Sequence, residues 1–222
     1  KMKALNTPNI ADVIIVDGGS TDGSIDVDCL LELGVRGLIV KIGPGKLSAQ
    51  LRCGYFFALQ ECYQGIITID GNDKDDPAPI PEFINALENG VDFVQGSRFI
   101  LGGVAHNTPK LRYLAVRLIH APVLRLASGF KWTDTTQGFR AYSHKVLVDP
   151  DVAVFREVFS TYELLAYLSY RLPRLGYRCL ELPTTRCYPE GKIPTKITTL
   201  GGGSQIVKIL LKTVLGLYNP GS

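Results

Sequence analysis

Hydrophobic and polar segments alternate along the first half of the chain. Four short aliphatic runs, each bounded by polar or glycine residues, predict buried strands at residues 11–16, 38–42, 66–69 and 92–95. Three intervening segments have the spacing of amphipathic helices, at residues 24–33, 48–64 and 79–89. Strands that alternate with helices predict an α/β fold, in which ligands bind beyond the C-terminal ends of the strands.

The second half of the chain alternates less regularly. Helical spacing appears at 110–128 and 159–172, and residues 177–183 predict a strand. Residues 132–142 form a polar loop that leads into a short strand. Residues 184–196 are rich in proline and basic residues and predict a long loop, where functional residues tend to lie.

A glycine-rich polar cluster, DGGSTDGS, follows the first predicted strand and runs from Asp17 to Ser24. A carboxylate at the end of a strand suits a ribose hydroxyl or a base edge, and the glycines let a ligand approach the backbone. The alternative interpretation is a tight turn closed by the Asp17 side chain. Taken alone, this cluster does not decide between the two.

An acidic cluster, DGNDKDD, follows the third predicted strand and runs from Asp70 to Asp76 with four carboxylates and one amide. So much negative charge favours a bound cation, and oxygen ligands suit Mg²⁺ or Mn²⁺. An EF-hand loop is excluded because Lys74 stands at its fifth position and Asp75 replaces the required glycine. A solvated acidic turn remains the alternative to a metal site.

Basic residues form a third candidate cluster, because arginine matches phosphate oxygens with paired donors. Its members are Arg98, Arg140, Arg186, Lys192 and Lys196. Each of them alone is as readily a surface charge, but a diphosphate held between a metal and these cations would account for both clusters. The histidines lack metal-ligand spacing, and His120, on an apolar helix, is interpreted as structural.

Composition narrows the function classes. The formal charge of +3, from 24 Lys and Arg against 21 Asp and Glu, gives no basic footprint for nucleic acid. The five cysteines contain no Cys-x-x-Cys pair and predict reduced thiols in a cytosolic setting. The helices expected around 113–130 and 206–218 are amphipathic. We expect them to pack on the core, with a membrane surface as the alternative.

The motifs together identify a resemblance. VDGGSTDGS, followed by IDGNDKDDP, resembles the inverting family 2 glycosyltransferases, whose Rossmann-like fold is the GT-A nucleotide-diphospho-sugar transferase type. VQGSRF, TDTTQGFRAY and RCYPEGKIPTK resemble the Gly-Ser-Arg turn, the Asp-x-x-x-Gly-Phe-Arg segment and the late basic loop of the dolichol-phosphate mannosyltransferase-like branch. The five motifs occur in the family's order between Asp12 and Lys196.

The resemblance implies one glycosyltransferase domain over 1–222, with a nucleotide-sugar-binding half at 1–100 and an acceptor-binding half at 101–222. It implies a general base or acceptor-positioning role for Asp134, and a metal site at Asp70 and Asn72 that Asp73 or Asp75 completes. The positions implied to bind the nucleotide, its phosphates or the sugar are Asp17, Gly19, Ser20, Asp22, Arg98, Arg140, Arg186 and Lys196.

The sequence departs from the family in three places. Gly18 replaces the second acid of Asp-Asp-Gly-Ser, and Asn72 replaces the second acid of Asp-x-Asp. The family's first strand, with its Pro-…-Asn-Glu nucleotide motif, has no counterpart here. A sheet without that strand would contain a gap, so we expect residues to be missing.

The implied activity is transfer of a sugar, with inversion, from a UDP- or GDP-type donor to a glycan, lipid-linked or phosphate acceptor. It requires Mg²⁺ or Mn²⁺ and serves cell-envelope glycan synthesis in the cytoplasm, at the inner face of the membrane. The alternatives are a sugar nucleotidyltransferase and a module that binds a sugar nucleotide without catalysis. A dehydrogenase is less favoured, because no Gly-x-Gly-x-x-Gly follows the first predicted strand.

Overall fold

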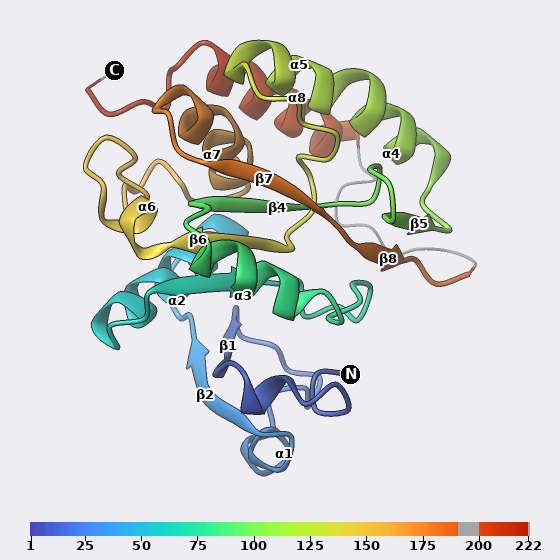
Figure 1. The fold of residues 1–222 in the computed structure, drawn as a ribbon, viewed down its shortest axis with the longest axis vertical. Coiled ribbons are helices and arrows are strands. Elements are labelled where there is room, and N and C mark those ends of the chain that lie inside the picture. Colours follow the sequence, from blue (N-terminus) through green and yellow to red (C-terminus); the bar gives the residue numbers. More distant parts are fainter. Residues whose placement is uncertain (191–199, 222) are drawn as a thin grey trace.

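The computed structural model describes residues 1–190 and 200–221, and it has a mixed α/β architecture (Figure 1). Helices cover two β-sheets, and a small additional pair of strands lies to one side. Within the described residues, no helix is long and apolar enough to cross a bilayer. A short 3₁₀ turn at Thr7–Asn9 (η1) precedes the first strand.

The N-terminal sheet has two parallel strands, β1 (Val13–Asp17) and β2 (Val35–Val40). Helix α1 (Val27–Glu32) connects them and is capped by the Asp26 carboxylate, which accepts from the backbone N–H of Cys29 at 2.9 Å. Helix α2 (Leu47–Gln60) follows β2 and packs against β1. This is the predicted strand–helix–strand–helix order.

The central sheet has the strand order β3-β6-β4-β7. Its strands are β3 (Gly65–Thr68), β6 (Arg140–Ser143), β4 (Phe93–Ser97) and β7 (Cys179–Pro183). Strand β6 runs antiparallel to both neighbours, whereas β4 and β7 are parallel, so the sheet is mixed. Because β6 lies between two strands of the first half, the two halves of the chain share one sheet.

Alternating side chains of the central sheet build two separate cores, as the two-residue period of a strand dictates. Phe93 and Tyr142 stack at 5.4 Å between ring centroids and face α5 (Ala121–Ser128), α7 (Glu163–Arg174) and α8 (Leu200–Val214). Their neighbours Val94 and Ala141 face the opposite side. There they pack with Phe83 of helix α3 (Ile80–Glu88).

The helix expected at 110–128 is a single run with a local change of pitch. It consists of α4 (Lys110–Ala115), a π-helical segment (Val116–His120) and α5. The backbone N–H of Ala121 bonds to the carbonyl of Val116 five residues back. Pro122, which has no N–H to donate, stands at the start of α5, where it accounts for the widened turn.

Three elements were not predicted. Helix α6 (His144–Val148) follows β6, and β5 (Val104–His106) pairs in parallel with β8 (Thr185–Cys187). Of these two strands, β8 lies within the expected loop at 184–196. Three-residue strands carry too little periodicity to be distinguished from loop sequence.

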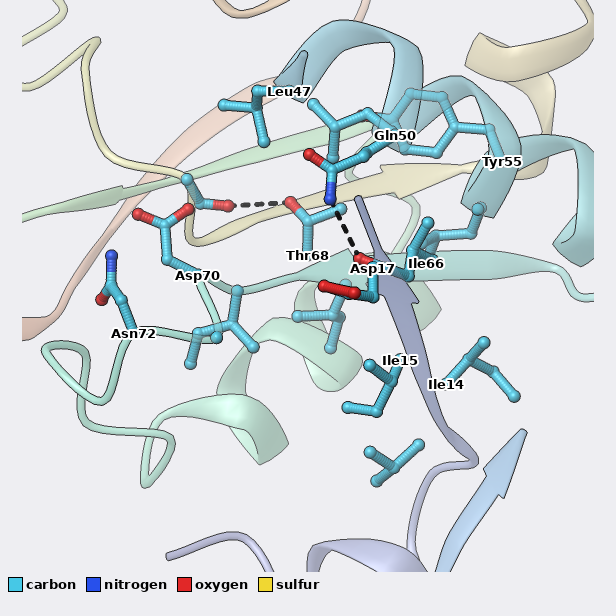
Figure 2. Close-up of a pocket in the computed structure, with 18 of the residues that line it drawn as sticks. Ile14, Ile15, Asp17, Leu47, Gln50, Tyr55, Ile66, Thr68, Asp70 and Asn72 are labelled. Atoms are coloured by element: carbon cyan, nitrogen blue, oxygen red, sulfur yellow. Dashed lines mark hydrogen bonds between the residues drawn. The ribbon is translucent and has the colours of Figure 1, made fainter. Parts of the chain in front are cut away.

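A cavity separates the two sheets. β1 pairs only with β2 and β3 only with β6 among the described strands, so each leaves one edge unpaired. Both edges line one cavity of about 2110 Å³, into which Ile14, Ile15 and Ile66 project (Figure 2). This cavity continues to the C-terminal ends of β1 and β3.

His120 makes the stability of the fold depend on pH. Its Nδ1 lies 2.6 Å from the Thr135 hydroxyl, and desolvation together with the charge of Arg140 lowers its pKa from 6.5 to about 4. The unfolded chain therefore binds the proton first. The neutral ring stabilises the fold fully above pH 6.5, and this contribution is lost as the pH falls from 6.5 towards 4.

Between pH 6.5 and pH 4, the wild type should lose more unfolding free energy than His120→Gln, because the variant has no imidazole to protonate. We predict a difference of about 2 kcal/mol in this loss. Urea denaturation at a series of pH values measures the effect. His106→Gln, at an exposed position, is the control for removing an imidazole. Parallel pH profiles for the wild type and His120→Gln would contradict the assignment.

Candidate functional site

Most of the predicted ligand-binding residues line the one cavity between the sheets. Figure 2 shows Asp17 at the end of β1, and Asp70 and Asn72 beside one another after β3. The predicted residues that line the cavity are Asp17, Gly19, Ser20, Asp70, Asn72, Arg98 and Arg186. Those that do not are Asp22, Asp73, Asp134 and Arg140. Lys192 and Lys196 lie outside the described residues.

The turn after β1 is held by the Asp17 carboxylate. One oxygen accepts from the backbone N–H groups of Gly19 at 3.0 Å and Ser20 at 2.6 Å. The other accepts from the Ser20 hydroxyl at 2.7 Å. The Ser20 bonds are the main reason that the pKa of Asp17 is lowered, and Gly19 adopts a φ of 96° that favours glycine. The turn thus presents backbone and a fixed negative charge to the cavity.

Asp22 holds the next turn of the same loop in a similar way. Its carboxylate accepts from the hydroxyl of Ser24 at 2.6 Å and from the Ser24 backbone N–H at 3.0 Å, and these bonds lower its pKa. Because the side chain lies outside the cavity lining, its predicted contact with a ligand stays a prediction. In the structure it shapes the loop.

The acidic loop after β3 is joined to β8 by side chains and by backbone. The Arg186 guanidinium donates to Asp70 at 3.0 Å and to the fully buried Asp75, which also accepts from Gln137 at 2.8 Å. The backbone N–H of Asp76 donates to Thr185, and that of Cys187 donates to Lys74. The loop is therefore a strand-like extension of β8 and not a freely solvated turn.

Burial and charge oppose one another in this cluster. Burial raises the pKa of Asp75, and the positive charge of Arg186 acts in the other direction. Burial also works against the charged form of Arg186, but the carboxylates of Asp75 and Asp70 outweigh it, so its pKa is raised. Arg186 therefore stays charged, and it compensates two carboxylates with one cation. Of the loop's charged side chains, Asp70 and Lys74 line the cavity.

The donor set fits a divalent metal that is bound partly by the protein. Asp70 and Asn72 offer a carboxylate and an amide oxygen side by side (Figure 2). Mg²⁺ and Mn²⁺ are commonly held by one or two carboxylates, with waters and substrate phosphates as the remaining ligands. Asp73 has a φ of 56° and pairs with Lys1 at 2.8 Å. Among the described residues, no three His, Cys, Asp or Glu side chains form a metal cluster.

Asp134 and Arg98 form a buried ion pair behind the cavity. The guanidinium donates to the two Asp134 oxygens at 2.6 and 3.0 Å, and the Asp134 side chain has no exposed surface. Glu181 holds the same loop by accepting from the backbone N–H groups of Thr133 and Asp134. In this arrangement Asp134 orients Arg98, and its predicted role as a general base would require a rearrangement.

Arg140 has a different environment from the one predicted. It has no exposed surface, and its guanidinium donates to the backbone carbonyls of Gln137, Leu165 and Thr135 at 2.8 to 3.0 Å. Its donors are thus used to fasten the polar loop before β6 onto α7. The phosphate contact suggested for Arg140 finds no support in this geometry.

Three contributors to the cavity were missed from the sequence. Gln137 links Asp75 to Thr184, and Arg112 of α4 donates to the Tyr188 hydroxyl at 3.1 Å. Gln50 of α2 donates to the Val16 carbonyl at 3.3 Å, next to Gly18 (Figure 2). Gln137 lies within the TDTTQGFRAY segment, so the resemblance of that segment to the family motif could have identified it as a site residue. Nothing in the local sequence marked the other two.

Sequence comparison finds relatives among synthases and sugar transferases named for polyprenol, undecaprenyl phosphate and dolichyl phosphate. The chain is 24% identical over 176 residues to a polyprenol monophosphomannose synthase of Mycolicibacterium smegmatis. It is 28% identical over 178 residues to an undecaprenyl-phosphate mannosyltransferase of Micrococcus luteus, and 30% identical over 150 residues to a dolichyl-phosphate hexose transferase of Haloferax volcanii. No protein-family model matches the chain.

These alignments cover 78%, 79% and 68% of the chain, and 65%, 71% and 61% of the respective relatives. The chain therefore spans about two thirds of the length of the proteins it matches. They confirm the predicted relationship to the dolichol-phosphate mannosyltransferase-like branch.

Structure comparison confirms the predicted GT-A fold. Glucosyl-3-phosphoglycerate synthase from Mycobacterium tuberculosis, in complex with Mn²⁺, UDP and phosphoglyceric acid, superposes with a TM-score of 0.63 at 15% identity. The match covers 97% of this chain and 72% of that one. The complex of the same enzyme with UDP alone gives a TM-score of 0.62 at 17% identity, over 96% and 75% of the two chains.

We predict that Arg186→Gln lowers the unfolding free energy at neutral pH by about 3 kcal/mol, because the buried Asp75 carboxylate loses its charged partner. The loss should shrink in acid, where Asp75 becomes protonated. Urea denaturation measures both effects. The control is Arg178→Gln, at an exposed arginine that donates to the Asn89 carbonyl at 3.1 Å. Equal losses in the two variants would show that the Arg186 bridge is not a major source of stability.

Proposed function

We propose that this chain, a GT-A-fold relative of the polyprenyl- and dolichyl-phosphate sugar transferases, transfers a hexose from a nucleotide-diphosphate sugar to a polyprenyl phosphate with inversion. The observation that carries the proposal is the convergence of two strand ends. The glycine turn at Asp17 and the acidic loop at Asp70 open into the same cavity, and Arg186 of β8 forms an ion pair with the loop there. That arrangement suits a nucleoside at the Asp17 turn, a metal at the Asp70 loop and a diphosphate beside Arg186.

The donor would lie along the ends of β1 and β3. The turn of Asp17, Gly19 and Ser20 would hold the nucleoside, since it offers a fixed carboxylate and accessible backbone. Asp70 and Asn72 would hold Mg²⁺ or Mn²⁺. The complex of the glucosyl-3-phosphoglycerate synthase with UDP and Mn²⁺ supports a UDP-type donor with a metal.

The diphosphate would be neutralised from two sides. A metal at Asp70 supplies Lewis-acid stabilisation of the leaving group. Arg186, which is shared between two carboxylates, would donate to a phosphate of the donor as well. Arg98, which Asp134 orients, lines the same cavity and would add a second guanidinium.

In the proposed reaction an acceptor phosphate oxygen attacks the anomeric carbon of the sugar. The bond from that carbon to the donor diphosphate breaks, and the nucleoside diphosphate leaves with the electron pair. The attacking oxygen is already anionic, so no general base is needed. This agrees with an Asp134 whose oxygens are both occupied by Arg98.

Binding of a sugar nucleotide without transfer is the second candidate. It is favoured by Asn72, which replaces one carboxylate of the family's metal motif and so weakens the negative field on a metal. The two candidates share the donor site and differ only in turnover. The relatives found by sequence comparison are sugar transferases and synthases of lipid-linked sugars, which favours both candidates over a nucleotidyltransferase.

We predict that titration calorimetry detects metal-dependent binding of UDP or GDP sugars. Removing the metal with EDTA should abolish most of the binding heat. Asp70→Ala should weaken binding by about 100-fold or more, because the proposed metal ligand and the partner of Arg186 are lost together. Asp28→Ala, on the exposed surface of α1, is the control.

The variant Asp73→Asn tests whether Asp73 is one of the metal ligands. If Asp73 completes the metal shell as the resemblance implies, this variant should weaken binding by about tenfold. An unchanged affinity would restrict the protein ligands to Asp70 and its neighbours. Binding that persists in Asp70→Ala, or in EDTA, would refute the donor site itself.

A further inference from the structure

The side chain of Gln50 on α2 lies against Gly18, in the turn after β1. Gly18 stands where the family motif has its second acid, so this turn has one carboxylate fewer than the motif. A Cβ atom built on Gly18 would lie 3.2 Å from the Gln50 Nε2 atom and 3.4 Å from its amide carbon. The amide therefore lies next to the position of the absent carboxylate, beside Asp17 and in the lining of the cavity (Figure 2).

Hydrogen bonds fix the place and the orientation of this amide. The first turn of α2 is bound to the segment before α7, because the backbone N–H of Ser48 donates to the Thr161 carbonyl at 2.8 Å. The Gln50 Nε2 donates to the Val16 carbonyl at 3.3 Å, so this end of the amide is turned towards β1 (Figure 2). Among residues 1–190 and 200–221, no hydrogen bond reaches the Gln50 Oε1. This oxygen is therefore an acceptor that a ligand can use.

The other polar side chains of the turn are already engaged. Both oxygens of Asp17 accept hydrogen bonds from the turn, and the hydroxyls of Ser20 and Ser24 donate to Asp17 and to Asp22. A ligand can bond to Gln50 without breaking any of these bonds. The amide offers Oε1 as an acceptor and the second Nε2 hydrogen as a donor next to it. Such a pair of groups suits a planar ring that carries an N–H next to a carbonyl.

We propose that the Gln50 amide binds the Watson–Crick edge of the donor base, and that Gly18 and Gln50 together make the site selective for uracil. Oε1 would accept from the N3–H group of uracil, and the free Nε2 hydrogen would donate to the adjacent O4. Cytosine has no hydrogen on N3, so it would set an acceptor against an acceptor. The inference rests on the proposed function, because it names the base of the donor in the same site.

Guanine differs from uracil at the atom beside the shared N–H and carbonyl. Its N1–H is flanked by an amino group, so its edge carries two adjacent donors, which a carboxylate accepts with both oxygens. The second acid of the family motif is replaced by Gly18, and the Gln50 amide has a single acceptor oxygen. One guanine donor would therefore lose its hydrogen bond to water without a replacement from Gln50. The turn thus favours uracil over guanine.

Titration calorimetry in Mn²⁺ with UDP, CDP, GDP and N3-methyl-UDP tests the contact. We expect UDP to bind most tightly and N3-methyl-UDP about tenfold more weakly, because the methyl group removes the N–H that Oε1 accepts. Gln50→Ala should weaken UDP by about tenfold as well. For this variant UDP and N3-methyl-UDP should bind equally, since the protein change and the ligand change remove the same hydrogen bond.

Two further variants test the selectivity. Gln50→Glu places a carboxylate at the same position, so it should weaken UDP about tenfold, strengthen GDP and reverse the preference. Gly18→Ala should weaken UDP selectively, because its methyl group would displace the amide. Gly18 does not have a positive φ, and the nearest atom is the end of a flexible side chain, so the backbone accepts alanine. The control is Gln60→Ala, at the exposed end of the same helix, with unchanged affinities.

Three results would overturn the inference: equal binding of UDP and N3-methyl-UDP by the wild type, tighter binding of GDP than of UDP, or equal affinities of Gln50→Ala and Gln60→Ala for UDP. Any of them, with sugar still transferred to polyprenyl phosphate, would leave the proposed function intact. The expected base preference without any transfer would support the inference and contradict the proposed function. Failure of all four nucleotides to bind would overturn both.

Discussion

Two carboxylates of the acidic loop, Asp70 and Asp75, share the guanidinium of Arg186 on β8. Asp75 is buried without access to solvent, so an unpaired charge there would cost several kcal/mol. The ion pair and the backbone bonds from Asp76 and Cys187 therefore fix the loop in one conformation. Fixing the loop is what presents Asp70 and Asn72 to the cavity. The candidate donor site depends on this bridge more than on any single ligand.

A second buried pair, Arg98 with Asp134, acts from behind the cavity in the same manner. Its carboxylate orients a guanidinium, and Glu181 and Arg140 hold the surrounding loop. The loop also meets His120 of the π-helical segment through Thr135. This side of the cavity is thus packed directly against the run from α4 to α5.

The sequence predicted the C-terminal ends of β1, β3 and β4 to within two residues, because aliphatic runs followed by Asp or by Gly-Ser-Arg mark both a buried strand and its polar terminus. The alternating helices and the resemblance to GT-A enzymes could also be recognised from the sequence. The hydrogen-bond and ion-pair partners of the site residues could not. Asp134 and Arg140 occur in a motif with recognised order, yet their burial depends on β6 inserting between β3 and β4, a pairing between distant segments. Likewise, the exposure of Leu118 and Leu126 depends on which helix face meets the core, and periodicity alone does not identify the face that stays uncovered.

The proposed activity is the transfer of a sugar to a lipid phosphate in this cavity. The most direct measurement supplies the protein with radiolabelled UDP-hexose or GDP-hexose, Mn²⁺ and polyprenyl phosphate, and follows the label into the organic phase. The account predicts a metal-dependent, lipid-linked product that mild acid hydrolyses to the free sugar. Intact nucleotide binding without any lipid-linked label, for every donor tried, would contradict it and leave a binding module in its place.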